Sequence, residues 1–266
     1  MMFKKKTLVV LAGLSLMAFG ATAVQAADLD QIKKDGVIRV AIAMGVPMFS
    51  YANAQMKPEG SDVSTAELLA KDLGVKLQFV PITNAARIPT IQTDKADICV
   101  CNLSITPERA KVVDFSVPYA SLQIIVAAPK ELKIKDYKDL KGVKIGVTRA
   151  TVNDTDITKN ASDANIRRYE DDATLVTAAA SKQVQAISSQ WPNVAEVNKK
   201  LKSDPYETKF VQHEFMLGIV MPKNTPKLKA WVDNWVHANL KNGELNTVYK
   251  KYHGSDLSSQ VLANGS

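Results

Sequence analysis

Two kinds of hydrophobic spacing alternate along this chain, and together they predict its secondary structure. Short runs that are apolar throughout or at every second position predict strands, and runs with apolar positions three or four apart behind a capping residue predict helices. The order strand–helix–strand–helix–strand occurs twice, which predicts two mostly parallel sheets with helices on their faces. The expected strands are 37–43, 75–80, 96–103, 143–147, 166–169 and 184–188, and the expected helices are 64–73, 86–93, a helix from Thr151, and 172–181.

The C-terminal part adds a strand near residues 215–221 and an amphipathic helix. Apolar residues from Leu228 to Leu240 recur at helical spacing, and Gly243 is expected to end this helix. Residues 257–266 are rich in Ser, Gly and Asn, so we expect a frayed tail. The two series predict two α/β lobes, each with a ligand-facing edge at the carboxyl ends of its strands.

The N-terminus has the pattern of an export signal, which we exclude from the fold. Lysines at 4–6 precede an apolar run over 7–21, and Val24-Gln25-Ala26 is a small-residue cleavage site. We expect cleavage before Ala27 and a mature chain in the periplasm. Without residues 1–26 the chain is long enough for two lobes of about 120 residues each.

Charge and cysteine usage narrow the classes of partner. The formal charge is +7, and it falls to +4 without the three lysines of the signal, with acidic and basic residues interspersed. This balance does not indicate nucleic acid, although it favours the approach of a small anion. Cys99 and Cys101 are the only cysteines, and we interpret them as two buried thiols on one strand face rather than a disulfide or a metal pair. The three histidines show no ligand spacing with them, so no metal site is predicted.

The segment 104–116 carries the clearest chemical signal. Thr106 can cap a helix, Pro107 suits its first position and Glu108 favours the positive end of the helix dipole. Because this helix start follows an expected buried strand, its free N–H groups converge on one place where an anion can bind. Arg109 lies one turn inside, and its planar guanidinium matches a carboxylate with two hydrogen bonds. The segment therefore predicts a site for a small carboxylate.

Several short motifs, in one order, give the chain a family resemblance. They are GVIRV at 36–40, SITPER at 104–109 with DFS at 114–116, DLKG at 139–142 with IGV at 145–147, and NGEL at 242–245 with VYKKY at 248–252. From about residue 35 to residue 255 the chain resembles the periplasmic solute-binding proteins of the polar-amino-acid ABC-transporter family. The resemblance implies a type II periplasmic-binding-protein fold, in which two Rossmann-like α/β lobes are joined by two crossing strands.

The resemblance also implies a division of the chain and a partner. Residues 27–121 and 222–266 would form lobe 1, and residues 122–221 would form lobe 2, with crossing strands near 121–127 and 216–223. The lobes would close on an amino acid or a similar small carboxylate, which an ABC permease in the inner membrane would then accept. In this function the protein is a monomer that needs no cofactor and is not an enzyme.

The family motif implies which residues hold the ligand's carboxylate. Arg109 matches the arginine that binds it, and Asn102 and Ser104 match positions whose N–H and side-chain groups complete the clamp. Thr151 and Val152 match the helix start of the second lobe, which adds further N–H donors.

Other positions depart from the family pattern. Gln190 stands where an aspartate normally meets the ligand's ammonium, and an amide supplies no negative charge. Val46 and Ser61 stand where aromatic rings often enclose the ligand, and Ala43 stands where a polar side chain often reaches it. A buried ammonium without a counter-charge is costly. The ligand would therefore either lack the α-ammonium or find its counter-charge elsewhere, with Asp154 as one candidate.

Further residues are candidates for the ligand cleft. Arg87 is a candidate second partner for an anion, because family members with an arginine before Ile-Pro include binders of acidic amino acids. Cys101 belongs to the same strand end as Asn102, and Phe49 and Trp191 are candidate apolar walls. The alternative interpretations are a solvated helix arginine for Arg87 and packing between the lobes for the two aromatic residues.

An enzyme is the main alternative function. Some proteins similar in fold and motifs are periplasmic dehydratases of the cyclohexadienyl type, in which a carboxylic acid in the cleft protonates a leaving hydroxyl group. This chain has no acid at position 190, and Asp154 and Glu214 are the remaining candidates for such an acid. A third alternative is a sensor module that presents its ligand to a membrane kinase.

Overall fold

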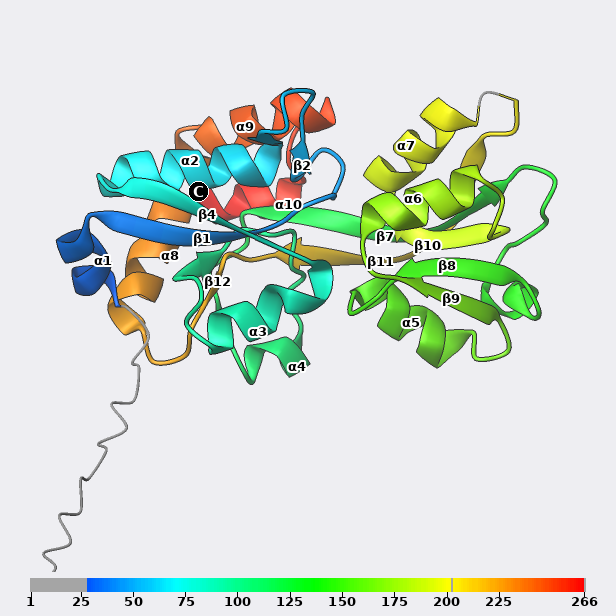
Figure 1. The fold of residues 1–266 in the computed structure, drawn as a ribbon, viewed down its shortest axis with the longest axis horizontal. Helices are drawn as coiled ribbons and strands as arrows, with labels where there is room; N and C mark the ends of the chain where they lie inside the picture. The colour runs from blue at the N-terminus through cyan, green and yellow to red at the C-terminus, as the bar shows by residue number, and fades with distance from the viewer. Residues whose placement is uncertain (1–27, 202, 266) are drawn as a thin grey trace, which may run out of the picture.

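The chain forms two α/β lobes side by side, joined by long strands that run between them (Figure 1). The computed structural model describes residues 28–201 and 203–265, so the predicted export signal lies outside the described part. Segments from both ends of the described chain, coloured blue to cyan and orange to red, lie in the left lobe, and the green to yellow segments of the middle make the right lobe. The predicted two-lobed α/β fold is confirmed.

The sheet of the first lobe has the strand order β4-β1-β5-β12-β6. β1 is parallel to β4 and β5, whereas β12 runs antiparallel to β5 and β6. Helices α2 and α9 lie next to each other on one side of this sheet (Figure 1). The elements are α1 (Leu29–Asp35), β1 (Val37–Ala43), β2 (Tyr51–Ala52), β3 (Pro58–Glu59), α2 (Ser61–Leu73), β4 (Lys76–Ile82), η1 (Asn84–Ala86), α3 (Arg87–Gln92), β5 (Ile98–Cys99), α4 (Pro107–Ala110), β6 (Asp114–Phe115), β12 (Val220–Met221), α8 (Pro226–Lys241), α9 (Glu244–His253), α10 (Ser259–Leu262) and η3 (Ala263–Gly265).

The sheet of the second lobe has the order β11-β7-β10-β8-β9. β8 is parallel to β9 and β10, and β7 runs antiparallel to β10 and β11. One buried cluster packs α6 and α7 against this sheet, and a second contains residues of α5 and η2. The elements are β7 (Ala120–Pro129), η2 (Tyr137–Leu140), β8 (Lys144–Thr148), α5 (Val152–Asn160), β9 (Asn165–Tyr169), α6 (Asp172–Ala180), β10 (Ala186–Gln190), α7 (Trp191–Lys200) and β11 (Tyr206–Leu217).

Strands β7 and β11 carry the chain between the lobes. They pair antiparallel from Ala120 opposite Leu217 to Pro129 opposite Tyr206. Ala120 and Leu217 belong to the buried core of the first lobe, and Tyr206 belongs to that of the second. The expected crossings overlap β7 and the end of β11, and the lobe boundaries themselves stay predictions.

Most expected elements are confirmed to within about two residues at each end, the usual uncertainty of such boundaries. The strand expected over 96–103 is only β5, and the strand expected near 215–221 is divided between the end of the much longer β11 and the separate β12. Helix α2 also differs, because it begins at Ser61 rather than at Ser64. Its N-cap is Gly60, whose φ of +133° and close contact with the Phe49 carbonyl suit only glycine. The Ser64 hydroxyl forms a hydrogen bond with the Tyr252 hydroxyl at 2.9 Å and caps no helix.

The expectation of a frayed C-terminal tail is wrong. Leu257 and Val261 are buried in the core of the first lobe, and residues 259–265 form α10 and η3. Gly265 packs so closely against α8 that a Cβ atom there would lie 2.8 Å from the backbone nitrogen of Lys241. Two apolar residues four positions apart anchor the tail. This helix was not predicted from the sequence because the segment is otherwise rich in polar residues.

The prediction of two free thiols is also wrong, because Cys99 and Cys101 form a disulfide. The prediction assumed an extended strand through residue 103, but β5 ends at Cys99. The two Cα atoms are 5.5 Å apart, which lies within the normal range for a disulfide. Directly after it, Asn102 adopts a left-handed backbone with φ +49°.

Candidate ligand-binding site

A small polar pocket lies between the two lobes, near the carboxyl ends of strands from both sheets. Its cavity of about 30 Å³ has room for one or two water molecules. Most of the residues that the sequence predicts for the ligand line it together. They are Arg87, Asn102, Ser104 and Arg109 from the first lobe and Thr151, Val152 and Gln190 from the second.

Arg109 reaches this pocket from the short helix α4. The helix start predicted at Thr106 is confirmed, since the Thr106 hydroxyl accepts a hydrogen bond from the Arg109 N–H at 3.3 Å. The Arg109 guanidinium donates to the Ser104 carbonyl at 2.9 Å and to the Ala150 carbonyl of the second lobe at 3.3 Å. Both acceptors are backbone oxygens, so these contacts orient the guanidinium without neutralising it.

Arg87 lies beside it and is 5% exposed, so its interpretation as a solvated helix arginine is wrong. Its guanidinium donates to the carbonyls of Asn84 at 2.8 Å and Asn102 at 3.0 Å. Longer bonds of 3.4 Å reach the carbonyls of Cys101 and Ala150. Every one of these acceptors is again a backbone oxygen.

The two guanidinium groups make the pocket electropositive. Burial and the neighbouring Arg109 lower the pKa of Arg87 to about 9, and burial lowers the pKa of Arg109 to about 10. Both remain cationic at neutral pH. Within residues 28–201 and 203–265 neither forms an ion pair with an acidic side chain. A carboxylate in the pocket would relieve their mutual repulsion and accept charge-assisted hydrogen bonds.

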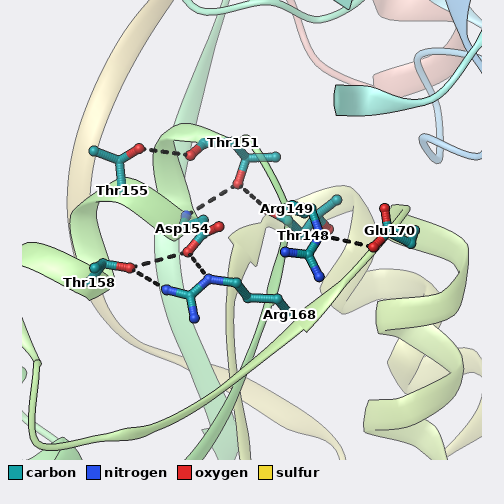
Figure 2. Close-up of polar contacts among 8 residues, drawn as sticks. All are labelled: Thr148, Arg149, Thr151, Asp154, Thr155, Thr158, Arg168 and Glu170. Carbon is teal, nitrogen blue, oxygen red and sulfur yellow. Dashed lines mark hydrogen bonds and ion pairs between the residues drawn. The ribbon is translucent and has the colours of Figure 1, made fainter. Parts of the chain in front are cut away.

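The second lobe adds a helix N-terminus to the same pocket. Thr151 caps α5 as predicted: its hydroxyl donates to the Thr148 carbonyl at 2.7 Å and accepts from the Asp154 N–H at 3.2 Å (Figure 2). The first N–H groups of a helix have no acceptor within it, and the helix dipole places positive potential there. Val152 and Asn153 carry such groups and line the pocket.

Polar contacts across the pocket hold the lobes together. The Asn102 amide donates to the Gln190 side-chain oxygen at 3.1 Å, and both side chains are buried. The Ala150 carbonyl accepts from both arginines. Since these partners belong to different lobes, the described conformation has the lobes in contact at the site.

Phe49 and Trp191 do not line this pocket. They border a neighbouring groove of about 560 Å³ that shares Leu122 and Gln190 with it. Phe49 is buried and meets the His253 ring edge-on at 4.6 Å between centroids, whereas Trp191 is 53% exposed. Phe49 is therefore mainly a packing residue, and Trp191 lies on the open side of the groove.

Other candidates are tied up elsewhere. The Cys101 side chain is in the disulfide, and only its carbonyl oxygen contributes, by holding Arg87. The Asp154 carboxylate pairs with the Arg168 guanidinium at 2.8 Å and with the Thr158 hydroxyl, away from the pocket (Figure 2). Asp154 therefore does not replace the missing counter-charge. Of the other departing positions, Val46 lines the pocket and Ser61 and Ala43 do not.

Among the pocket residues that the sequence analysis did not predict are Asn84, Asp172 and Asn193. All are buried. The Thr148 hydroxyl donates to the Asp172 carboxylate, and burial raises the pKa of Asp172 above its ordinary value. The Asp-Asp pair at the start of α6 indicates a helix start, but nothing in the local pattern shows which carboxylate turns inward.

Among the described residues there is neither a metal-binding cluster nor a membrane-spanning helix. There, no group of three or more His, Cys, Asp or Glu side chains is placed to hold a metal ion. Likewise, no helix among those residues has the length and apolar character to cross a membrane.

Comparisons with known proteins show which family and fold the chain is similar to. The sequence model of the bacterial extracellular solute-binding proteins, family 3, matches residues 38–255. The chain is 26% identical over 250 residues to the L-cystine-binding protein TcyJ of Escherichia coli, covering 93% of this chain and 92% of that protein. It is 28% identical over 251 residues to the cyclohexadienyl dehydratase of Pseudomonas aeruginosa, covering 88% and 89% of the two chains. A solved structure of the ancestral amino acid-binding protein AncCDT-1, a precursor of cyclohexadienyl dehydratase, superposes with a TM-score of 0.77 at 33% identity, covering 84% of this chain and 98% of that one.

Proposed function

Since the chain belongs to the bacterial extracellular solute-binding proteins, family 3, we propose that it is the periplasmic binding component of an ABC importer. Its ligand is an amino acid or a similar small carboxylate, held between the lobes and passed to a membrane permease. The observation that carries this proposal is the pair Arg87 and Arg109, whose guanidinium groups line one pocket and, among the residues that the structure describes, find only backbone acceptors.

Binding would couple the ligand to lobe closure. The arginines belong to the first lobe and the N–H groups of Val152 and Asn153 to the second, so one carboxylate can accept hydrogen bonds from both. A ligand that contacts both lobes stabilises the closed arrangement by its differential affinity for that arrangement. The cavity of about 30 Å³ is too small for an amino acid, so the lobes or the lining side chains must move to admit one.

The test is isothermal titration calorimetry on the mature protein with the twenty L-amino acids and L-cystine. We expect at least one to bind, and its α-carboxamide to bind much more weakly because it removes the negative charge. Arg109→Gln should weaken binding by about 2 to 4 kcal/mol, or roughly 30- to 1,000-fold, through loss of charge-assisted hydrogen bonds. Arg167→Gln is the matched control, because it removes one exposed positive charge from the second lobe outside the pocket. Equal binding of acid and carboxamide, or full affinity in Arg109→Gln, would overturn the proposal.

A second candidate function is the cyclohexadienyl dehydratase reaction, which the Pseudomonas relative is named for. The observation in its favour is Asp172, a pocket carboxyl group whose pKa is raised by burial, as general acid catalysis requires. Incubation with prephenate or arogenate, followed by ultraviolet absorbance of an aromatic product, separates the two functions. Turnover that disappears in Asp172→Asn would favour the enzyme over the binding protein.

A further inference from the structure

We propose that Asp172 and Asn193 form an ammonium subsite in the second lobe, so that the ligand is a zwitterionic α-amino acid. This rests on the proposed function, because it assumes that the carboxylate end of the same ligand binds Arg87 and Arg109. The subsite replaces the counter-charge that Gln190 does not supply.

Asp172 is the first residue of α6 and faces the pocket with 5% of its surface exposed. A threonine hydroxyl, that of Thr148, donates to its carboxylate, and no Lys, Arg or His side chain of the described ranges forms an ion pair with it. Burial raises the pKa of Asp172, and the positive charge of Arg87 offsets part of that rise, although the two groups do not touch. The first lobe thus presents positive charge to the pocket and the second lobe presents negative charge.

Asn193 lies beside Asp172, on the first turn of α7, and is completely buried. Its amide nitrogen donates to the Ser189 hydroxyl at 2.6 Å. Its Oδ1 atom has no hydrogen-bond donor among the residues that the structure describes, and the same holds for Oδ1 of Asn84 on the opposite wall. Buried amide oxygens normally find a donor, so these two indicate a group that the ligand supplies.

An ammonium group matches this set of acceptors. It brings three N–H donors and one positive charge, for which the pocket offers a carboxylate and two unpaired amide oxygens. A 2-oxo acid offers no donor at this place, and a 2-hydroxy acid offers one donor without charge. Gln190 supplies no negative charge for this role, and its side-chain oxygen already accepts one hydrogen bond from Asn102.

The test compares amino acids with 2-oxo acids of the same side chain by calorimetry on the full mature protein. The pairs are L-glutamate with 2-oxoglutarate, L-phenylalanine with phenylpyruvate, L-cysteine with 3-mercaptopyruvate and L-alanine with pyruvate. For the side chain that binds, we expect the 2-oxo acid to bind about 30-fold more weakly or worse, the effect of a lost charge-assisted hydrogen bond. This comparison uses the unmodified protein and does not depend on a variant that folds.

Variants then assign the effect to residues. Asp172→Asn should weaken amino-acid binding about 30-fold and change 2-oxo-acid binding less than about 3-fold, and Asn193→Leu should act in the same direction by about 5-fold. Asp154→Asn is the matched control, since its carboxylate is paired with Arg168 outside the pocket, and it should change neither ligand.

The outcomes separate the subsite from the proposed function. A 2-oxo acid that binds as tightly as its amino acid overturns the subsite and leaves the carboxylate site intact. An Asp172→Asn variant that weakens both ligands equally makes Asp172 a structural residue and also overturns it. If no carboxylate of either class binds, the proposed function itself fails.

Discussion

Gly60 offers a sharp test of how the first lobe holds the loop beside the binding site. Its φ of +133° with ψ of 175° lies in a region that essentially only glycine occupies. A Cβ atom built there would lie 2.2 Å from the Phe49 oxygen and 2.5 Å from the Phe49 carbonyl carbon. Since the neighbour is backbone, Gly60→Ala cannot be relieved by a side-chain rotation.

The magnitude follows from what must move. The forbidden backbone conformation alone costs about 1 to 3 kcal/mol. Moving the loop away also breaks the bonds from the Asp62 N–H to the Phe49 carbonyl at 2.8 Å and from the Ser61 N–H to the Met48 carbonyl at 2.9 Å, each worth about 1 kcal/mol. Together we expect Gly60→Ala to lower the free energy of unfolding by about 3 to 5 kcal/mol, a large part of a typical total of about 5 to 15 kcal/mol.

Urea denaturation followed by tryptophan fluorescence and by far-ultraviolet circular dichroism measures this change. Gly74→Ala is the matched control, because Gly74 also has a positive φ, of +76°, but a Cβ atom there meets nothing within 4 Å. That control should cost only about 1 to 2 kcal/mol, the penalty of a left-handed backbone. If Gly60→Ala costs no more than Gly74→Ala, the close contact with Phe49 does not hold this loop and the reasoning is wrong.

Three more predictions concern pH, closure and the disulfide. Burial raises the pKa of Asp62 to about 7 from its ordinary value of 3.8 in the unfolded chain. Between about pH 4 and pH 7 the folded protein therefore binds more protons than the unfolded chain. Over this range the free energy of unfolding falls as pH rises, by up to about 4 kcal/mol from this carboxyl group. Asp62→Asn should remove this part of the pH dependence in urea titrations at about pH 5 and pH 8, and an unchanged slope would contradict it. Gln190→Leu loses the hydrogen bond from Asn102 between the lobes, which is worth about 1 kcal/mol. The ligand-free variant should therefore populate a more open form, measured as a larger radius of gyration in small-angle X-ray scattering. Identical scattering curves for the variant and the unmodified protein would contradict this role of the contact. Reduction of the Cys99–Cys101 bond should lower the free energy of unfolding by only about 1.5 kcal/mol, because the loop it closes is so short, and a loss above about 4 kcal/mol would refute the chain-entropy reasoning.

Most of the fold could be predicted from the sequence because local signals and tertiary structure agree. The apolar run of β1, the threonine cap of α5 and the Pro107 start of α4 each depend on neighbours within a few residues. The errors arose where a distant contact decides. Helix α2 begins early because Gly60 fits against the Phe49 carbonyl, and the Cys99–Cys101 disulfide forms because the strand ends sooner than its apolar pattern.

The candidate site could be predicted from the sequence only in part. Arg109 follows a recognisable helix start, and the structure places it with Arg87 in one pocket. Asp172 and Asn193 have no local signal, because their inward direction depends on how α6 and α7 pack against the sheet of the second lobe. Their role as an ammonium subsite stays a proposal until the ligand is known.

The acceptor that both arginines share is the carbonyl oxygen of Ala150, and it has a consequence for how the binding specificity can evolve. Ala150 has an exposed side chain and a left-handed φ of +60°. Its contribution to the lobe contact comes from the main chain, which a substitution at position 150 does not remove. Pocket side chains other than those of Arg87 and Arg109 can therefore diverge under selection for new solutes while this contact between the lobes persists. Because the lobe contact and the side chains that select the ligand can change independently, the same fold can acquire a different ligand through few substitutions.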